Sequence, residues 1–216
     1  MSHEKRLSSP RTWPIPRKGT KYLTRQYPGK IADLSMPLNL IIRDVLKLAH
    51  IRKEVKIMIH NREILINGKF AAKEKCSVGL FDVVSIPKIK KSYRLSLNDK
   101  MKLETEEVSD AEAKQKVCKI IGKTVLKGNK LQLNFLNGGN ALSDAKASME
   151  DSVMIEMSSG KILKHLPMKE GAKALIIGGK HMGQKGTVDR INDKEAVMRI
   201  GKESFNIKLR NVYVTA

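Results

Sequence analysis

The sequence is poor in several features that would each indicate a class of protein. Aromatic residues make up only 4% of the 216 positions, which disfavours a surface built on rows of stacked bases. The two cysteines, Cys76 and Cys118, are far apart and form no CxxC pair, so they indicate a reducing compartment and no zinc module. No apolar run approaches the length that spans a bilayer, and the basic N-terminus lacks the apolar segment of a secretory signal.

Motifs for catalysis and nucleotide binding are also missing. A P-loop requires G-x-x-x-x-G-K-[ST], but Gln184 stands at the lysine position after Gly178 and Gly183, and Val117 stands where a glycine must precede Gly122. The sequence contains no HExxH, GxSxG or kinase signature, and the five histidines are scattered without ligand spacing. We therefore expect no enzyme, no cofactor and no metal site.

Positive charge is what the chain has in excess. Lys and Arg number 42 against 22 Asp and Glu, which gives a formal net charge of +20. Such a balance indicates a polyanionic partner, with nucleic acid as the first candidate and an anionic membrane surface as the second. A hydrophobic content of 41% is enough for folded cores, so the chain is not a disordered tail.

Residues 1–36 form a basic segment in which four prolines forbid a continuous helix. Apolar residues are sparse, so we expect this arm to be disordered in the free protein. A solvated tail is one interpretation. The other is an arm that orders along nucleic acid, which is favoured by Trp13, Tyr22 and Tyr27 among the basic residues.

Residues 37–90 show two helical patterns followed by a hairpin. Ser35 before Pro37 is typical of a helix start, and apolar residues recur at helical spacing as far as Ala49. Arg43 and Lys47 are four residues apart and are predicted to share one helix face. A second helix is expected over residues 51–60, with Val55, Ile57 and Ile59 buried. Strands are expected at 63–66 and 81–86, with a tight turn at Asn67-Gly68.

The remaining chain is predicted to be mostly β-structure. Strands are expected at 93–97, 101–104, 117–125 and 130–135, and the acidic cluster Glu104, Glu106 and Glu107 is expected to face solvent without a catalytic role. Five short strands at 152–157, 174–177, 186–191, 196–200 and 204–207 favour a small SH3-like barrel. Within it, residues 171–188 predict strand, glycine-rich basic loop and strand, a loop that lets an anion approach bare backbone.

Several stretches resemble a known family. MPLNLIIRDVLKLAHIRKEVKIMI, ILINGKF and VGLFDVVSIP resemble the small RNA-binding fold named after ribosomal protein S-four, and residues 171–188 resemble a KOW motif. Together with HEKRLSSPRTW, VCKIIGK, KLQLNF and SFNIKLRNVYV, they are similar to the small-subunit ribosomal protein family called S-four-e. The absence of a longer C-terminal extension favours an archaeal-type member.

The resemblance implies an α+β multidomain protein: a basic N-terminal arm (1–36), an S-four-like RNA-binding domain of two helices and a hairpin (37–90), a β-rich central domain (91–168), and a KOW-containing SH3-like β-barrel (169–216). The implied function is a structural constituent of the small ribosomal subunit, in the cytoplasm, with small-subunit ribosomal RNA and neighbouring ribosomal proteins as partners and no membrane or small-molecule substrate. The residues expected to bind RNA are Lys5, Arg6, Arg11, Trp13, Arg17, Lys18, Arg43, Lys47, Arg52, Lys53, Lys56, Lys180, His181, Lys185, Lys208 and Arg210.

Two alternatives come from other classes. A transcription elongation factor with a KOW motif would need a polymerase-binding α/β domain where this chain has the S-four-like pattern. An RNA-modifying enzyme such as a pseudouridine synthase would need a catalytic domain with an essential aspartate, and residues 88–170 offer no such pocket.

Overall fold

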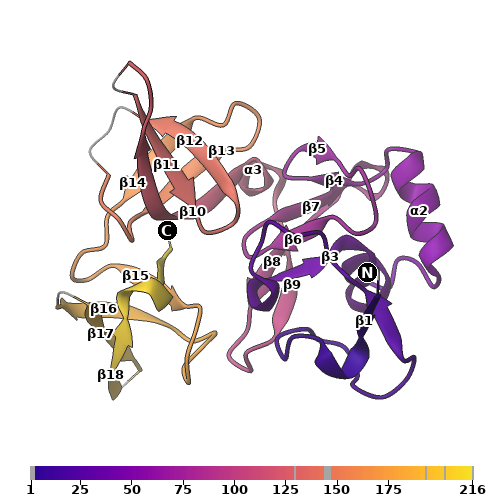
Figure 1. The fold of residues 1–216 in the computed structure, drawn as a ribbon, viewed down its shortest axis with the longest axis horizontal. Helices are drawn as coiled ribbons and strands as arrows, with labels where there is room; N and C mark the ends of the chain where they lie inside the picture. Colours follow the sequence, from indigo (N-terminus) through magenta and orange to yellow (C-terminus); the bar gives the residue numbers. More distant parts are fainter. Residues whose placement is uncertain (1–2, 129, 144–146, 193, 202, 216) are drawn as a thin grey trace. The chain divides into compact units, whose positions relative to one another are not determined.

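The computed structural model describes residues 3–128, 130–143, 147–192, 194–201 and 203–215. These form two compact units (Figure 1). The first comprises Met1–Leu97 and Met101–Lys114, and the second comprises Asn98–Lys100 and Gln115–Ala216. The fold is mixed and mostly sheet, in agreement with the predicted α+β class.

The first unit is built on a five-stranded antiparallel sheet and two smaller strand pairs. The large sheet has the order β5-β4-β7-β8-β9, and the pairs are β1-β2 and β3-β6. The strands are β1 (His3–Lys5), β2 (Tyr22–Thr24), β3 (Ser35–Pro37), β4 (Leu65–Ile66), β5 (Lys69–Phe70), β6 (Ser77–Gly79), β7 (Val83–Ile86), β8 (Lys91–Leu97) and β9 (Leu103–Val108). Short 3-10 turns are η1 (Arg6–Ser8), η2 (Ala32–Leu34) and η4 (Pro87–Ile89). Strand β7 pairs with β8, so the sheet continues past residue 90, where the sequence predicted a domain boundary. The division into four domains stays a prediction.

The first predicted helix is shorter and wider than expected. It comprises α1 (Leu38–Leu40) and a π-helical segment, η3 (Ile41–Val45). Ser35 does not cap it, because Ser35 lies in β3 and its hydroxyl donates to the carbonyl oxygen of Ile31 at 2.6 Å. Lys47 lies beyond the end of η3 with a φ of 55°, so the prediction that it shares a helix face with Arg43 is wrong.

The second helix is α2 (Arg52–His60), close to its predicted range. The Glu54 carboxylate accepts backbone N–H groups of His50 at 2.7 Å and Ile51 at 3.3 Å, which satisfies two donors at the start of the helix. These backbone hydrogen bonds lower the pKa of Glu54. Val55 is buried as predicted, but Ile57 is 59% exposed and Ile59 is only half-buried, so the burial prediction holds for Val55 alone.

The turn at Asn67-Gly68 is confirmed. Both residues have positive φ, 52° and 75°, as a two-residue hairpin turn of the primed type requires. The turn joins β4 to β5, and β4 also pairs with β7. The hairpin therefore contributes to the main sheet of the first unit.

The N-terminal arm is packed rather than extended, contrary to the expectation of disorder. Trp13 is 1% exposed, and its indole N–H donates to the carbonyl oxygen of Ser35 at 2.8 Å. Ile15 and Leu23 are also buried, and β1 pairs with β2. The three buried side chains supply apolar mass that the sparse composition did not suggest.

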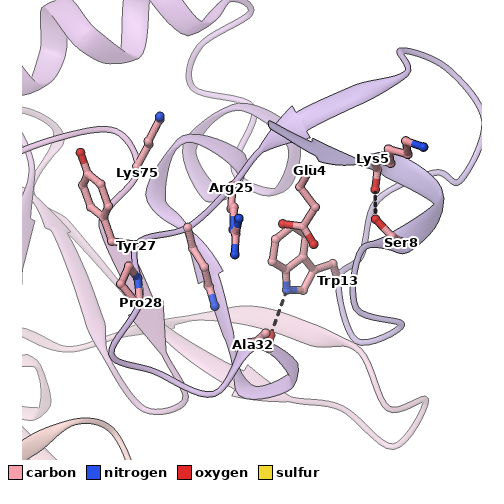
Figure 2. Close-up of a pocket in the computed structure, with 10 residues that line it drawn as sticks. Glu4, Lys5, Ser8, Trp13, Arg25, Tyr27, Pro28, Ala32 and Lys75 are labelled. Atoms are coloured by element: carbon pink, nitrogen blue, oxygen red, sulfur yellow. Dashed lines mark hydrogen bonds between the residues drawn. The ribbon is translucent and has the colours of Figure 1, made fainter. Parts of the chain in front are cut away.

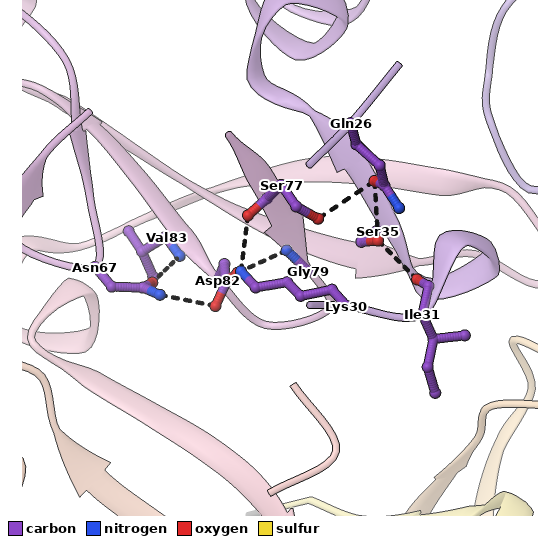
Figure 3. A network of polar contacts seen from close by, with 9 residues as sticks. All are labelled: Gln26, Lys30, Ile31, Ser35, Asn67, Ser77, Gly79, Asp82 and Val83. Atoms are coloured by element: carbon purple, nitrogen blue, oxygen red, sulfur yellow. Dashed lines mark hydrogen bonds and ion pairs between the residues drawn. The ribbon is translucent and has the colours of Figure 1, made fainter. Parts of the chain in front are cut away.

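Lysine 30 attaches the arm to the sheet region (Figure 3). Its ammonium group donates to the carbonyl oxygen of Ser77 at 2.8 Å and pairs with the fully buried carboxylate of Asp82. Asp82 also accepts the N–H of Gly79 at 2.6 Å and the side-chain amide of Asn67 at 2.8 Å. A buried carboxylate is thus surrounded by three donors, one of which comes from the arm.

The second unit contains two five-stranded antiparallel sheets, with the orders β12-β11-β10-β13-β14 and β18-β17-β16-β15-β19. The strands of the first are β10 (Gln115–Val125), β11 (Leu131–Phe135), β12 (Gly139–Ser143), β13 (Ser152–Glu156) and β14 (Ile162–Leu166). Those of the second are β15 (Lys173–Ile176), β16 (Lys185–Ile191), β17 (Glu195–Ile200), β18 (Glu203–Lys208) and β19 (Val212–Val214), with a 3-10 turn, η5 (Leu209–Asn211), before the last. The short helix α3 (Asp110–Ala113) belongs to the first unit.

The strand expected at 152–157 is not part of the C-terminal sheet. As β13, it pairs with β10 and β14, so it completes the central sheet instead. The C-terminal sheet is open in strand order, with β18 and β19 at its edges, and the expected closed barrel is not confirmed. Its core side chains are Ala174, Ile176, Val188, Ala196, Met198, Ile207 and Val212.

Strand β10 is buried on both faces at Cys118, Lys119 and Ile120. Cys118 and Ile120 belong to the core of the central sheet, and the alternation of the strand turns Lys119 to the opposite face. There, its ammonium group donates to the carbonyl oxygens of Leu209, Arg210 and Val212, at 2.8, 2.9 and 2.6 Å. The phenol of Tyr213 donates to the carbonyl oxygen of Val117 at 2.8 Å. These bonds join β10 to η5 and β19.

Candidate nucleic-acid interface

The cations of the arm divide into two groups. Arg6 donates to the carbonyl oxygens of Thr20 and Pro16 at 2.7 and 2.8 Å, and Arg17 donates to those of Leu7 and Ser9 at 3.0 and 3.1 Å. These two guanidinium groups hold the turns of the arm together. The second group consists of the exposed residues Lys5, Arg11 and Lys18.

Trp13 is the predicted RNA contact whose placement differs most from the expectation. The ring is buried, and its N–H is bonded to Ser35. A base cannot stack on a ring that the protein itself covers, so Trp13 has a structural role in this arm. The exposed aromatic residues there are Tyr22 and Tyr27.

The basic residues of α2 are presented to solvent. Lys53 and Lys56 are exposed, and Arg52 forms an ion pair with Glu74. Burial raises the pKa of Glu74, but the hydrogen bond from Arg52, with further contributions from backbone N–H and Lys56, lowers it overall. Lys53 and Lys56 therefore leave more positive charge for an external anion than Arg52 does.

Arg43 and Lys47 also differ in whether their charge is paired within the protein. The guanidinium of Arg43 makes two hydrogen bonds to the adjacent Asp44, at 2.9 and 2.7 Å, and this bonding raises the pKa of Arg43. Lys47 is exposed at the end of η3. The pair Arg43–Asp44 is locally neutral, whereas Lys47 presents a free charge in the part of the chain that the structure describes.

The glycine-rich loop between β15 and β16 has the predicted order of strand, loop and strand. Lys180 and Lys185 are exposed. His181 is only half-buried, and its ring stacks on Phe205 with 4.0 Å between centroids, while its Nδ1 lies 3.1 Å from the amide oxygen of Gln184. The lysines are thus presented to solvent, and His181 is mainly a packing residue.

The glycines of this loop serve the packing of the protein itself. A Cβ on Gly186 would overlap the carbonyl oxygen of Arg199 in the neighbouring strand β17, and Gly179 has a φ of +93°. The expectation that bare backbone is kept free for an anion is therefore not met at Gly186, where another strand occupies the space. Lys208 and Arg210, near the end of the same sheet, are exposed.

Sequence reasoning named Lys5 as a site residue but missed two further basic residues in the first unit. Arg25 and Lys75 line a cleft with Lys5, although they lie far apart in the sequence. Only their position in the fold brings them together, and no motif marks them.

The acidic cluster is exposed on β9, as predicted. Among the described residues, no three His, Cys, Asp or Glu side chains gather to form a metal site, and no helix is long and apolar enough to cross a membrane.

Comparison with known proteins covers almost the whole chain. The family model "Ribosomal family S4e" matches residues 89–162, and the KOW motif matches residues 170–200. The small ribosomal subunit protein eS4 of Archaeoglobus fulgidus is 39% identical over 86% of this chain and 78% of its own length. That of Methanosphaera stadtmanae is 34% identical over 98% and 91%.

A solved structure agrees with these relatives. The crystal structure of 30S ribosomal protein S4e from Thermoplasma acidophilum has a TM-score of 0.72 and 28% identity, and the match covers 84% of this chain and 94% of that one. Of the stretches that suggested S-four-e from the sequence, VCKIIGK and KLQLNF fall within the S4e match, and residues 171–188 fall within the KOW match. The chain belongs to the S4e family of small-subunit ribosomal proteins.

Proposed function

We propose that the protein is a structural constituent of the small ribosomal subunit, where it binds ribosomal RNA and contacts neighbouring ribosomal proteins. The observation that carries this function is the near full-length similarity to archaeal proteins named small ribosomal subunit protein eS4. The formal net charge of +20 supports it, because phosphate groups are the abundant anions of such a particle. The protein would act in the cytoplasm as part of the ribosome, and its family is structural rather than enzymatic.

We further infer an S-four-like RNA-binding unit and an SH3-like KOW unit within the chain. The first would consist of α1, η3 and α2 with the hairpin β4–β5, and the second of β15 to β19. Lys47, Lys53 and Lys56 in the first and Lys180, Lys185, Lys208 and Arg210 in the second are exposed, which supports phosphate contacts by these residues. Lys5, Arg11 and Lys18 would add contacts from the arm.

Sedimentation of the protein with isolated small subunits tests the function. Co-sedimentation at low salt and progressive release at high salt is the expected result, since phosphate contacts release counterions. Co-migration with polymerase instead, or recovery in the supernatant at low salt, would contradict the ribosomal role.

The double variant K53A/K56A tests the assignment of α2. Each lost phosphate contact is expected to reduce the slope of log affinity against log salt by about one. The slope measured for this double variant should therefore be smaller by about two. The matched control is K91A, because Lys91 is also exposed but lies 3.1 Å from the Glu107 carboxylate. An unchanged slope for K53A/K56A would remove α2 from the RNA-binding surface.

A further inference from the structure

The first unit contains a cleft of about 650 Å³ beside the N-terminal arm, within the size range of sites that hold small organic groups (Figure 2). Its walls come from two distant parts of the chain, the arm and the segment before β6. The lining includes Glu4, Lys5, Trp13, Arg25, Tyr27 and Lys75. Lys5 and Trp13 were among the residues predicted to bind RNA, whereas Glu4, Arg25, Tyr27 and Lys75 were not.

Hydrogen bonds hold the apolar part of the cleft in place. Trp13 is fixed by its hydrogen bond to Ser35 and forms a buried wall. Tyr27 is 39% exposed, and its backbone N–H donates to the carbonyl oxygen of Lys75 at 2.9 Å. Tyr27 therefore presents an accessible ring from an anchored backbone, which is the arrangement that a stacked planar group requires.

The polar part of the cleft is unused by the protein. Among the described residues, no hydrogen bond or ion pair engages the side chains of Lys5, Arg25 or Lys75, in contrast to Arg6 and Arg17 in the same unit. The Glu4 carboxylate is half-buried and receives no hydrogen bond from that part of the chain. Burial raises its pKa, although Arg25 acts in the opposite direction. A ligand that donates to Glu4 would offset this desolvation.

We propose that this cleft binds a single unpaired nucleotide of RNA whose base carries an amino group. The base would stack against Tyr27, its amino group would donate to the Glu4 carboxylate, and the flanking phosphates would lie near Lys5, Arg25 and Lys75. Bases in folded RNA are read in this way when they leave the stack. The inference rests on the proposed function, and it adds a base-specific contact to a surface otherwise described by charge alone.

Charge complementarity favours RNA over a protein segment. An acidic peptide would place carboxylates beside Glu4, where like charges repel. A basic peptide would satisfy Glu4 but meet the three cations of the cleft. A nucleotide combines donors on a flat ring with negative charge on either side, which is the complement of this lining. Uracil has no amino group, and its ring N–H donor lies between two carbonyl oxygens that repel a carboxylate.

The test uses the full-length protein and labelled pentaribonucleotides UUXUU, in which X is G, C, A or U. Fluorescence anisotropy gives the affinities, and the fluorescence of Trp13, the sole tryptophan, reports whether the cleft is occupied. We expect the amino-bearing bases to bind about ten-fold more tightly than U, with a saturable change in Trp13 fluorescence. E4Q is expected to bring this ratio close to one, because glutamine both donates and accepts.

Tyr27 is tested with two variants. Y27A is expected to weaken all four oligonucleotides about ten-fold, whereas Y27F, which keeps the ring, is expected to bind like the unmodified protein. The matched controls are Y22A, which removes another exposed tyrosine of the arm, and E106Q, which changes an exposed carboxylate on β9. Both are expected to leave the affinities and the base preference unchanged.

Equal affinity for all four bases, a preference that survives E4Q, or no change in Trp13 fluorescence would each overturn the proposal. A saturable Trp13 response to an arginine-containing peptide, without one to RNA, would assign the cleft to a protein neighbour. Sedimentation with the small subunit separates this result from the wider function. If the protein joins the subunit but shows no base preference, only the nucleotide site is refuted.

Discussion

Each unit contains an ion pair between a lysine and a carboxylate, but the two units bury opposite members of the pair. In the first unit the carboxylate is the buried partner: the Asp82 side chain is 0% exposed, while Lys30 keeps 19%. In the second unit the ammonium is the buried partner: Lys119 is 0% exposed, while Glu150 keeps 26%. Asp82 is surrounded by donors, and Lys119 is surrounded by carbonyl acceptors. Each unit thus fastens one segment to its sheet through a buried charge.

This difference shows how little a count of charges says about where they act. Lys30 and Lys119 contribute to the net charge as fully as Lys180 or Lys185 does, yet their side chains are bonded inside the fold. Arg6 and Arg17 are further cations that bond to the protein's own backbone. The partner-facing charge is therefore smaller than the composition suggests, and it is defined by which cations lack internal acceptors.

The largest effect is expected from K119M. The substitution leaves three backbone carbonyl oxygens without their donor and the Glu150 carboxylate without its partner, so we expect a loss of about 3–5 kcal/mol in the free energy of unfolding. Urea unfolding measures the loss, and native-state hydrogen exchange shows whether β10 and β19 lose protection. The control is K123M, an exposed lysine in the same strand. If both variants were equally stable, the bonds of Lys119 would not hold β10 to η5 and β19.

The pH dependence of the unfolding free energy gives a second test of the buried Lys119. Burial lowers the pKa of Lys119 more than Glu150 raises it. Below this lowered native pKa, Lys119 is protonated in both states and its contribution is constant. Between the native pKa and the ordinary value of 10.5, the unfolded chain holds a proton that the folded chain has lost, so stability rises with pH. The difference in unfolding free energy between the unmodified protein and K119M should widen over this window. A constant or narrowing difference would contradict it.

A smaller loss is expected from K30M, about 1–2 kcal/mol in the free energy of unfolding. Asp82 keeps the donors from Gly79 and Asn67, and the removed ammonium was partly solvated. The predicted order, K119M more damaging than K30M, follows from how many groups lose their partner: K119M strands three carbonyl oxygens and a carboxylate, whereas Asp82 keeps two of its donors after K30M. Urea unfolding with hydrogen exchange at β6 and β7 measures it, with K18M as an exposed control in the arm. The reverse order would show that burial of the carboxylate matters more.

Local patterns predicted the local features of the fold. Asn67-Gly68 predicted a turn because few residue pairs tolerate two positive φ values, and α2 was found from its periodicity. The order of strand, loop and strand at residues 171–188 was predicted in the same way, from the glycines that interrupt the apolar run. The family was recognised from the order of such features along the chain.

Long-range contacts decide what local patterns did not predict. The buried Trp13 has its N–H satisfied by the carbonyl oxygens of Ser35 and Ala32, and both acceptors lie outside the local sequence of Trp13. Lys119 alternates with Cys118 and Ile120 as a solvent-facing residue would, but the C-terminal turn η5 covers that face. The cleft residues Arg25 and Lys75 belong to segments that only the fold brings together. Exposure, and hence the candidate RNA surface, depends on such contacts.

The smallest effect on stability is expected from K180A/K185A, which separates cations that face a partner from those that fasten the fold. Both side chains are exposed, and no internal acceptor engages them in the described part of the chain, so the free energy of unfolding should change by less than about 0.5 kcal/mol. Binding to small-subunit RNA should weaken, with the salt slope reduced by about two, because two phosphate contacts are lost. A stability loss comparable to that of K30M would place these lysines among the fastening cations. An unchanged salt slope would mean that the glycine-rich loop acts in packing alone.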